Sequence, residues 1–303
     1  MHSIKMIAGV AVATASLCIP SAWSATQVFS GSGAEATTAL DDFRAAIGGD
    51  RNAGPAQATG RREIGWDGVR LDGTDANPNT QVVDPGSTVI IPIDRFQNQG
   101  ALFEDPYAVS GDGFASVNPG TAGQFPAFSP NNTFVMQDTI PYQFDDRFIE
   151  QSFTIPGTGT AAGTRGFGAI FVDVEKAGSS SIEYFGHDTT GKEVSLGSYA
   201  VPTGDASGEP QFLGVLFDNP VVTEVKLTVG TNALFNFDGN SFQSFGEENL
   251  TGSTDLAVTD DFVFAEPTMA AAIPEPSSYA LMLAGLGLLG FVAYRQKQGF
   301  NRI

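Results

Sequence analysis

The chain has few of the side chains that covalent or acid–base catalysis normally uses. Its two histidines are His2 and His187, and His2 lies at the very start, so a Ser-His-Asp triad would depend on His187. His187 stands beside Asp188 in a predicted hairpin turn, where a solvated turn residue is the favoured interpretation. The sequence has no Gly-x-Ser-x-Gly, His-Glu-x-x-His or phosphate-loop motif. We therefore assign no catalytic residue and expect a protein that is not an enzyme.

Carboxylates are the only potentially catalytic side chains that are numerous in this sequence. There are 34 Asp and Glu against 15 Lys and Arg, which gives a formal net charge of −19 at pH 7. Paired carboxylates cleave glycosidic bonds, but no spacing in this sequence distinguishes two of them. A carboxylate-dependent glycoside hydrolase or lyase is therefore the alternative to a non-catalytic protein. The negative charge also repels nucleic acid, so we expect no nucleic-acid partner.

Calcium is the ligand that the acidic and amide side chains suggest first. Asp75, Asn77 and Asn79 alternate along the chain, as at the start of an oxygen-ligand calcium loop. Thr80 and Gly86 stand where such a loop needs Gly and Glu, so an Asx-rich turn is the competing interpretation. Residues 236–240 (NFDGN) have the same pattern and the same weakness.

A second calcium candidate is the pair Asp260-Asp261, which opens the last predicted strand. The pair resembles the closing strand of jelly-roll carbohydrate-binding modules, in which such an Asp helps to hold a structural calcium. The resemblance implies a calcium site at Asp260 and Asp261. A strand that simply begins with a turn-forming Asp pair is the competing interpretation.

Sugar binding would need an exposed aromatic ring on which a pyranose face can stack. Trp66 is the candidate, and Asp67 beside it would accept hydrogen bonds from sugar hydroxyls. A buried Trp66 that anchors the first strand of the body is the favoured interpretation, because large aromatic side chains mostly serve the core. Trp66 and Asp67 are therefore a glycan-binding hypothesis rather than an assignment.

The elements that must position these residues are mostly strands. Short β-rich segments separated by Gly, Pro, Asn and Asp turns begin near Glu63. The best of them are residues 88–93, 148–155, 168–174, 181–185, 194–201, 212–217, 221–229 and 261–265. Residues 182–196 read as a hairpin. The 24 Phe and 36 Gly residues fit a phenylalanine-rich sandwich with many tight turns. We predict an all-β, jelly-roll-like β-sandwich body over residues 63–266.

One amphipathic helix is predicted before the body, at residues 37–47. Thr37 or Thr38 would cap it, and Leu40, Phe43 and Ile47 would share its buried face. The Gly48-Gly49 pair would end it. The helix and the polar loop or linker of residues 50–62 make up an N-terminal segment, 25–62.

The first 24 residues have the three regions of a secretory signal peptide. A short basic start is followed by an apolar stretch, and the small residues Ala22 and Ser24 occupy the −3 and −1 positions. We predict cleavage between Ser24 and Ala25, with an uncleaved N-terminal anchor as the competing interpretation. Cys18 is the only cysteine, so the mature chain would contain no disulfide and no Cys-ligated metal.

The other end of the chain carries an apolar segment, residues 279–294, after a linker of residues 267–272. At about 1.5 Å per residue, this segment would form a helix roughly 24 Å long. That is short for a bilayer core of about 30 Å but usable with local thinning. Pro274 and Pro276 would mark the helix start, and the positive charge that begins at Arg295 would place the C-terminus in the cytoplasm. A buried core helix is the competing interpretation.

In this order and position, Pro274-Glu275-Pro276, the apolar segment and Arg295 resemble the PEP-CTERM sorting signal of Gram-negative bacteria. The resemblance covers residues 273–303. It implies processing near the Pro-Glu-Pro tripeptide by an exosortase, a membrane protease-transferase, in a setting of exopolysaccharide production and biofilm assembly. The stretches 166–175, 212–218 and 260–267 are also similar to the bodies of PEP-CTERM surface proteins of unassigned activity.

These observations together predict a secreted protein with a non-catalytic structural or glycan-binding role. One transmembrane helix would first hold it in the inner membrane with the body in the periplasm. Processing would then move it to the cell surface or extracellular matrix. The expected partners are the Sec machinery, signal peptidase, the exosortase, the membrane and exopolysaccharide. Structural calcium is the only cofactor that the sequence suggests.

Overall fold

The computed structural model describes residues 27–74, 79–136, 147–272, 285–287 and 289. Strands dominate, as predicted for an all-β protein, and α1 (Ala34–Ile47) is the long α-helix of the described part, in which residues 285–287 and 289 are also helical. Three short 3₁₀ helices lie in the connections: η1 (Trp66–Gly68), η2 (Gln97–Gln99) and η3 (Pro119–Thr121). No helix among the described residues has the length and apolar character needed to cross a bilayer. The predicted helix 279–294 lies mostly outside the described residues.

The larger of two main sheets has nine strands, and its named pairings are all antiparallel. Its order is β1-β12-β9-β16-β7-β6-β4-β3, with β2 also paired to β16. The strands are β1 (Gln27–Ser32), β2 (Arg61–Ile64), β3 (Gln81–Asp84), β4 (Thr88–Ile91), β6 (Tyr107–Ser110), β7 (Thr133–Met136), β9 (Gly166–Val172), β12 (Pro210–Leu216) and β16 (Val258–Ala265).

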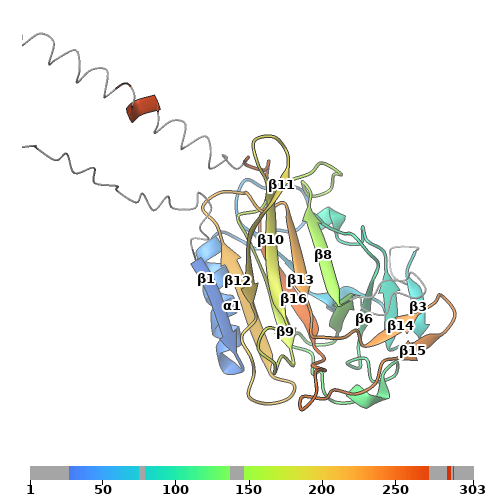
Figure 1. Cartoon of the computed structure of the whole chain (residues 1–303). Helices are drawn as coiled ribbons and strands as arrows, with labels where there is room; N and C mark the ends of the chain where they lie inside the picture. The colour runs from blue at the N-terminus through green and yellow to red at the C-terminus, as the bar shows by residue number, and fades with distance from the viewer. Residues whose placement is uncertain (1–26, 75–78, 137–146, 273–284, 288, 290–303) are drawn as a thin grey trace, which may run out of the picture.

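The second sheet has five antiparallel strands in the order β11-β10-β13-β8-β5. They are β5 (Ala101–Phe103), β8 (Phe148–Phe153), β10 (Ser181–His187), β11 (Glu193–Ala200) and β13 (Glu224–Thr228). A separate two-stranded ribbon pairs β14 (Phe235–Phe237) with β15 (Phe242–Ser244). Figure 1 shows β10, β13 and β8 in front of the larger sheet.

The two sheets pack face to face around one apolar core. Along β10, Ile182 and Tyr184 are buried while Glu183 between them is partly exposed, as the two-residue period of a strand requires. Buried side chains from both sheets form a single cluster, and the hydroxyl of Tyr184 donates to the carbonyl of Phe167 in β9 at 3.0 Å. The predicted sandwich is therefore present, with its core between the sheets.

The larger sheet is also covered on its second face. There α1 lies beside β1 and β12, where Leu40, Phe43 and Ile47 are buried (Figure 1). The ring of Phe43 contacts the rings of Phe29 and Phe212 at centroid distances of 5.5 and 5.6 Å. Because both faces are covered, every residue of β9 is buried, which explains its almost continuous apolar sequence.

The predicted buried face of the helix is confirmed, but its predicted start is wrong. The helix begins at Ala34, three residues before Thr37, and no side chain caps it. Gly33 turns the chain with a φ of 58°, and its N–H donates to the carbonyl of Pro210 at 2.8 Å, so contact with β12 fixes the start. The predicted end is confirmed, because Gly48 follows the last helical residue with a φ of 74°.

Each of the eight predicted strands is present, with ends that differ by a few residues. The predicted hairpin is confirmed by the pairing of β10 with β11. No strand was predicted before Glu63, yet β1 pairs with β12 over its whole length. Its sequence, QVFSGS, has one Gly and two Ser and looks like a loop, and only its position beside β12 makes it a strand.

Candidate functional site

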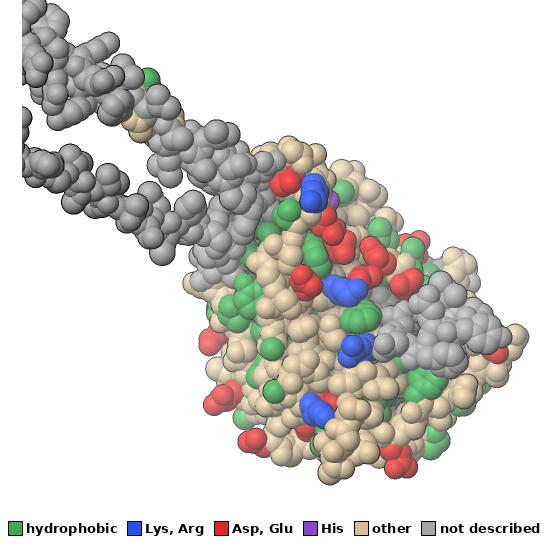
Figure 2. Space-filling model, viewed as in Figure 1, with side chains coloured by type: hydrophobic (Ala, Val, Ile, Leu, Met, Phe, Trp, Pro, Cys, Tyr) green, Lys and Arg blue, Asp and Glu red, His purple; other side chains and the backbone are tan. Residues whose placement is uncertain are grey.

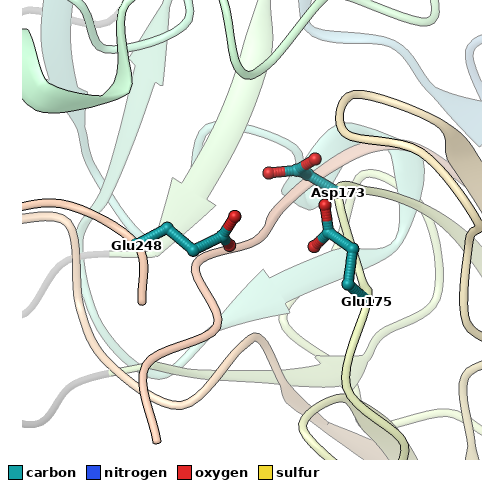
Figure 3. Close-up of side chains that lie close together, drawn as sticks. All are labelled: Asp173, Glu175 and Glu248. Carbon is teal, nitrogen blue, oxygen red and sulfur yellow. The ribbon is translucent and has the colours of Figure 1, made fainter. Parts of the chain in front are cut away.

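Three carboxylates meet at one end of the sandwich, at positions that sequence analysis did not select. Asp173 directly follows β9, Glu175 is two residues further on, and Glu248 lies in the connection between β15 and β16. One oxygen from each side chain can be chosen so that all three lie within 4.8 Å of one another. Figure 3 shows Glu248 approaching from the opposite side to Asp173 and Glu175, with the carboxylates turned toward one another.

Asp173 is the buried and firmly held member of this cluster. Its backbone has a φ of 72°, a left-handed conformation that Asp tolerates better than most residues. The amide of Gln124 donates to its Oδ2 at 2.5 Å, and the backbone N–H of Gly208 donates to its Oδ1. Two loops therefore orient the Asp173 carboxylate.

Glu175 is the unsatisfied member. Both of its carboxylate oxygens are fully buried, and no donor in the described part of the chain forms a hydrogen bond with them. Burial and then the neighbouring Asp173 raise the pKa of Glu175 well above its ordinary range, with smaller effects from Glu248 and Asp255. The group is thus placed where a negative charge is costly unless something positive compensates it.

Glu248 and Asp255 complete the negative environment. Burial raises the pKa of Glu248 to about 7, and the charges of Asp173 and Asp255 add to the effect, although the N–H of Leu256 donates to Glu248 and lowers it. Asp255 is fully buried and accepts a hydrogen bond from the N–H of Lys176 at 3.1 Å.

No arginine or lysine neutralises this group of acids in the part of the chain that the structure describes. None of the ion pairs found there includes Asp173, Glu175, Glu248 or Asp255. The ammonium group of Lys176 donates instead to the carbonyl of Gly252 at 2.7 Å. An all-oxygen cluster of this charge suits a hard cation. The sequence does carry a signal for two of these four acids: Asp173 and Glu175 form an Asp-x-Glu pair that directly follows an apolar strand.

The predicted pair Asp260-Asp261 lies in β16, apart from this cluster. Asp260 is buried and accepts hydrogen bonds from the N–H groups of Phe128 and Ser129 and from the Ser129 hydroxyl, at 2.7, 3.1 and 2.9 Å. Burial and the charge of Asp261 raise the pKa of Asp260 to about 7 against those hydrogen bonds, and burial raises the pKa of Asp261. Asp260 thus ties the 128–129 loop to the sheet, and a calcium ion at the pair stays a prediction.

The glycan-stacking role suggested for Trp66 is wrong, and the favoured core interpretation is confirmed. Trp66 has no exposed surface, and its indole N–H donates to the carbonyl of Asp260 at 2.9 Å. Its ring contacts those of Phe96 and Phe262, both at a centroid distance of 5.3 Å. Asp67 is exposed and accepts a hydrogen bond from the N–H of Asn131 at 2.9 Å.

Several other predicted positions carry less information. Asp75 and Asn77 lie outside the described residues, and Asn79 is exposed. In the second calcium-like segment, Asp238 accepts hydrogen bonds from the N–H groups of Asn240 and Ser241. These are the bonds of an Asx turn, the competing interpretation. The positions assigned to export and sorting also lie outside the described residues: Ser24, Ala25, Pro274, Glu275, Pro276 and Arg295.

Comparison with known families gives a match at the C-terminal end of the chain. The family model of the PEP-CTERM protein-sorting motif matches residues 272–297. The chain carries a PEP-CTERM sorting motif. The motif implies export, an exosortase as processing partner, and a membrane-anchored sorting signal. No match was found among the curated proteins or among the solved structures.

The sorting motif begins directly after the last described backbone contacts of the body. Thr268 exchanges two backbone hydrogen bonds with Gly163, and the N–H of Ala271 donates to the carbonyl of Pro220 at 2.9 Å. The motif match starts at the next residue. A pocket of about 440 Å³ lies at the same end of the body and is lined in part by Arg165, Glu266 and Thr268.

Proposed function

We propose that this protein acts non-catalytically at the cell surface or in an exopolysaccharide matrix, as a structural or glycan-binding component. The observation that carries the proposal is the PEP-CTERM motif, which starts one residue after Ala271, the last described residue with a backbone hydrogen bond to the body. That arrangement suits a folded unit that an exosortase separates from its membrane signal.

The burial of the acid cluster supports a non-catalytic role. A glycosidase needs two carboxylates that reach the two sides of a bound glycosidic bond. Asp173 and Asp255 have no exposed surface, and both carboxylate oxygens of Glu175 are buried. The residues that line the pocket near Glu266 include none of these acids. The alternative function, a hydrolase or lyase on polysaccharide, would require this cluster to open to substrate if its carboxylates were the catalytic pair.

The outer face of the five-stranded sheet is the surface best suited to glycan contact. Several of its outward positions in β8, β10 and β13 are occupied by charged and aromatic residues that are only partly buried. They include Phe148, Glu150, Glu183, Phe185 and Lys226. Figure 2 shows acidic and basic side chains gathered on the face where these strands lie. We call these five residues the outer-face set.

Within this set, charge and aromatic surface are combined as a sugar site requires. The ammonium group of Lys226 lies 2.5 Å from Oε1 of Glu150 and 4.4 Å from the centre of the Phe148 ring. Phe185 lies in the next strand of the sheet, opposite Glu224. Sugar rings pack on aromatic side chains while their hydroxyls bond to neighbouring carboxylates and ammonium groups.

Sorting is tested by replacing Pro274-Glu275-Pro276 with three alanines in a host that has an exosortase. We expect the unchanged chain to lose its C-terminal segment and leave the membrane, and the variant to stay unprocessed in the membrane fraction. The matched control replaces Ser277 and Ser278 with alanine, which leaves the tripeptide intact. Equal processing of the tripeptide variant and the unchanged chain would contradict the proposal.

The role of the body is tested with the exported protein and exopolysaccharide purified from the same host. We expect retention on the polysaccharide that falls at least about tenfold on Phe148→Ala or Phe185→Ala, because hydrophobic contact with the ring is lost. Phe242→Ala is the control, since this Phe is 38% exposed but lies in the β14–β15 ribbon. Release of new reducing ends from the polysaccharide would support the enzyme instead.

A further inference from the structure

We propose that Asp173, Glu175 and Glu248 together bind one calcium ion, which joins the end of β9 to the connection that precedes β16. The ion would lie where the three carboxylates face one another (Figure 3). This site differs from both positions at which the sequence suggests calcium.

The geometry fits a single ion. Calcium binds oxygen ligands at about 2.3–2.6 Å, so two ligands on opposite sides of one ion are separated by up to about 5 Å. The three carboxylates supply oxygens that all lie within 4.8 Å of one another. One calcium ion at their centre would contact all three without large movement of the backbone.

The second observation is the state of Glu175. Its two oxygens are buried, face the cluster and accept no hydrogen bond from the described residues. A buried polar group without a partner costs free energy, and a buried charge without a partner costs more. Cation coordination would satisfy these oxygens. A proton is another way to lower the cost, and Glu175 would then donate it to Asp173. The test below separates the cation from the proton.

The surroundings resemble an outer coordination shell. The Gln124 amide donates to Asp173 and so orients one of the proposed ligands. The N–H of Gly208 fixes the other Asp173 oxygen. Asp255, which is fully buried, adds a fourth acid beside Glu175. An ion would therefore join two segments of the chain directly, and hydrogen bonds to Asp173 would link it to two more, at Gln124 and Gly208.

The chemistry of the ligands favours calcium over other ions. There is no His or Cys among them, which disfavours zinc and copper. Magnesium keeps several waters and seldom uses a site built from three carboxylates, whereas calcium takes six to eight oxygens in flexible geometry. Calcium sites in extracellular modules bind at about 10⁻⁴–10⁻³ M, which suits an exported body.

The test uses the full-length chain, purified in mild detergent and dialysed against a chelator at pH 7.5. Calcium chloride is added in a calorimetric titration, and melting is followed with calcium and with chelator. We expect calcium to raise Tm by about 5 °C or more at saturating concentration. Glu175→Gln and Glu248→Gln should each bind calcium at least about tenfold more weakly, because a carboxylate ligand is lost. Both should still fold, since the amide removes charge repulsion.

Matched variants locate the ion. Glu224→Gln, at a half-buried acid of the other sheet, and Asp260→Asn, at the predicted calcium pair, should retain the full response. If the wild-type protein shows neither binding heat nor a change in Tm at 10 mM calcium (roughly ten times the weakest Kd expected), protons alone neutralise the cluster and the proposal is overturned. It is also overturned if Glu175→Gln and Glu248→Gln respond to calcium like the wild type, because the effect would then come from other acids. An equal response to magnesium in the wild type and in every variant would overturn it for the same reason.

Discussion

Arg62 and Glu266 form a buried two-point ion pair between β2 and the residue that follows β16. The Nε and Nη2 atoms of Arg62 donate to the two carboxylate oxygens of Glu266, each at 2.8 Å, and the side chains are 0% and 2% exposed. Burial acts to raise the pKa of Glu266, but the hydrogen bonds from Arg62, the N–H of Gln57 and Asn52 hold it below its ordinary value. The pair thus fixes the end of the body next to the sorting motif.

Arg62→Met should lower the free energy of unfolding by about 3–5 kcal/mol, because Glu266 would remain buried without its cation. The double variant Arg62→Met/Glu266→Met should lose less than the single one, since no charge is left unpaired. Arg51→Met is the control: Arg51 is 61% exposed and 3.7 Å from Glu63, so its loss should cost less than about 1 kcal/mol. Urea unfolding measures all three. A cost below about 1 kcal/mol for Arg62→Met would contradict the prediction.

Trp66→Ala should destabilise the body by about 3–5 kcal/mol, because it removes a fully buried ring from the core between the sheets. Trp66→Phe keeps part of the packing but leaves the carbonyl of Asp260 without its indole donor, so a smaller loss of about 1–3 kcal/mol is expected. Polysaccharide retention by the Trp66→Phe variant should be unchanged below its melting temperature. A specific loss of retention would contradict the purely structural role of Trp66.

The body strands could be predicted because each is a short segment with either a two-residue alternation or a nearly continuous apolar run. The pattern in β8, with Ile149, Gln151 and Phe153 buried between partly exposed residues, is a local signal. β1 and the start of α1 lack such a signal, because contact with β12 determines both. Sequence reasoning therefore found the elements that carry their own pattern and missed those that depend on a neighbour.

The candidate site was harder to predict for the same reason. Asp173 and Glu175 are close in sequence, but Glu248 belongs to a connection more than seventy residues further on. The φ of 72° at Asp173 directs its carboxylate into the cluster, and no residue pattern reports that angle. Asp260 stood out in the sequence because it is one of two adjacent acids, yet its oxygens bond to a loop.

Gly168→Ala should destabilise the body by about 1–3 kcal/mol through overpacking. Gly168 lies in the central strand β9, where an added Cβ would be 2.7 Å from Cζ of Phe212 and 2.9 Å from the Cα of Gly214. Gly159→Ala is the matched control, because the nearest atom to its added Cβ is 3.9 Å away. Thermal melting of the two variants and the wild type checks the prediction, which fails if the two alanines have equal effects.

Glu224 should make the folded protein less stable as pH rises, whereas an acid in a salt bridge makes it more stable. Burial raises its pKa to about 7, and the charges of Glu104, Glu193 and Glu150 add to the effect, while Lys226 opposes it. Between its ordinary value of 4.5 and about 7, the folded chain retains a proton that the unfolded chain has released. Unfolding free energy must therefore fall as pH rises through that window, and the loss is complete above it.

Glu224→Gln removes this titration and should abolish that part of the pH dependence. We expect the variant and the wild type to be equally stable near pH 4, and the variant to be more stable at pH 8. Glu183→Gln is the control, because Glu183 lies on the same face in β10 and its carboxylate accepts a hydrogen bond from the Ser195 hydroxyl at 2.6 Å. Urea unfolding in chelator at several pH values between 4 and 8 measures the difference. A difference between Glu224→Gln and wild type that stays constant with pH would show that Glu224 titrates normally in the folded protein.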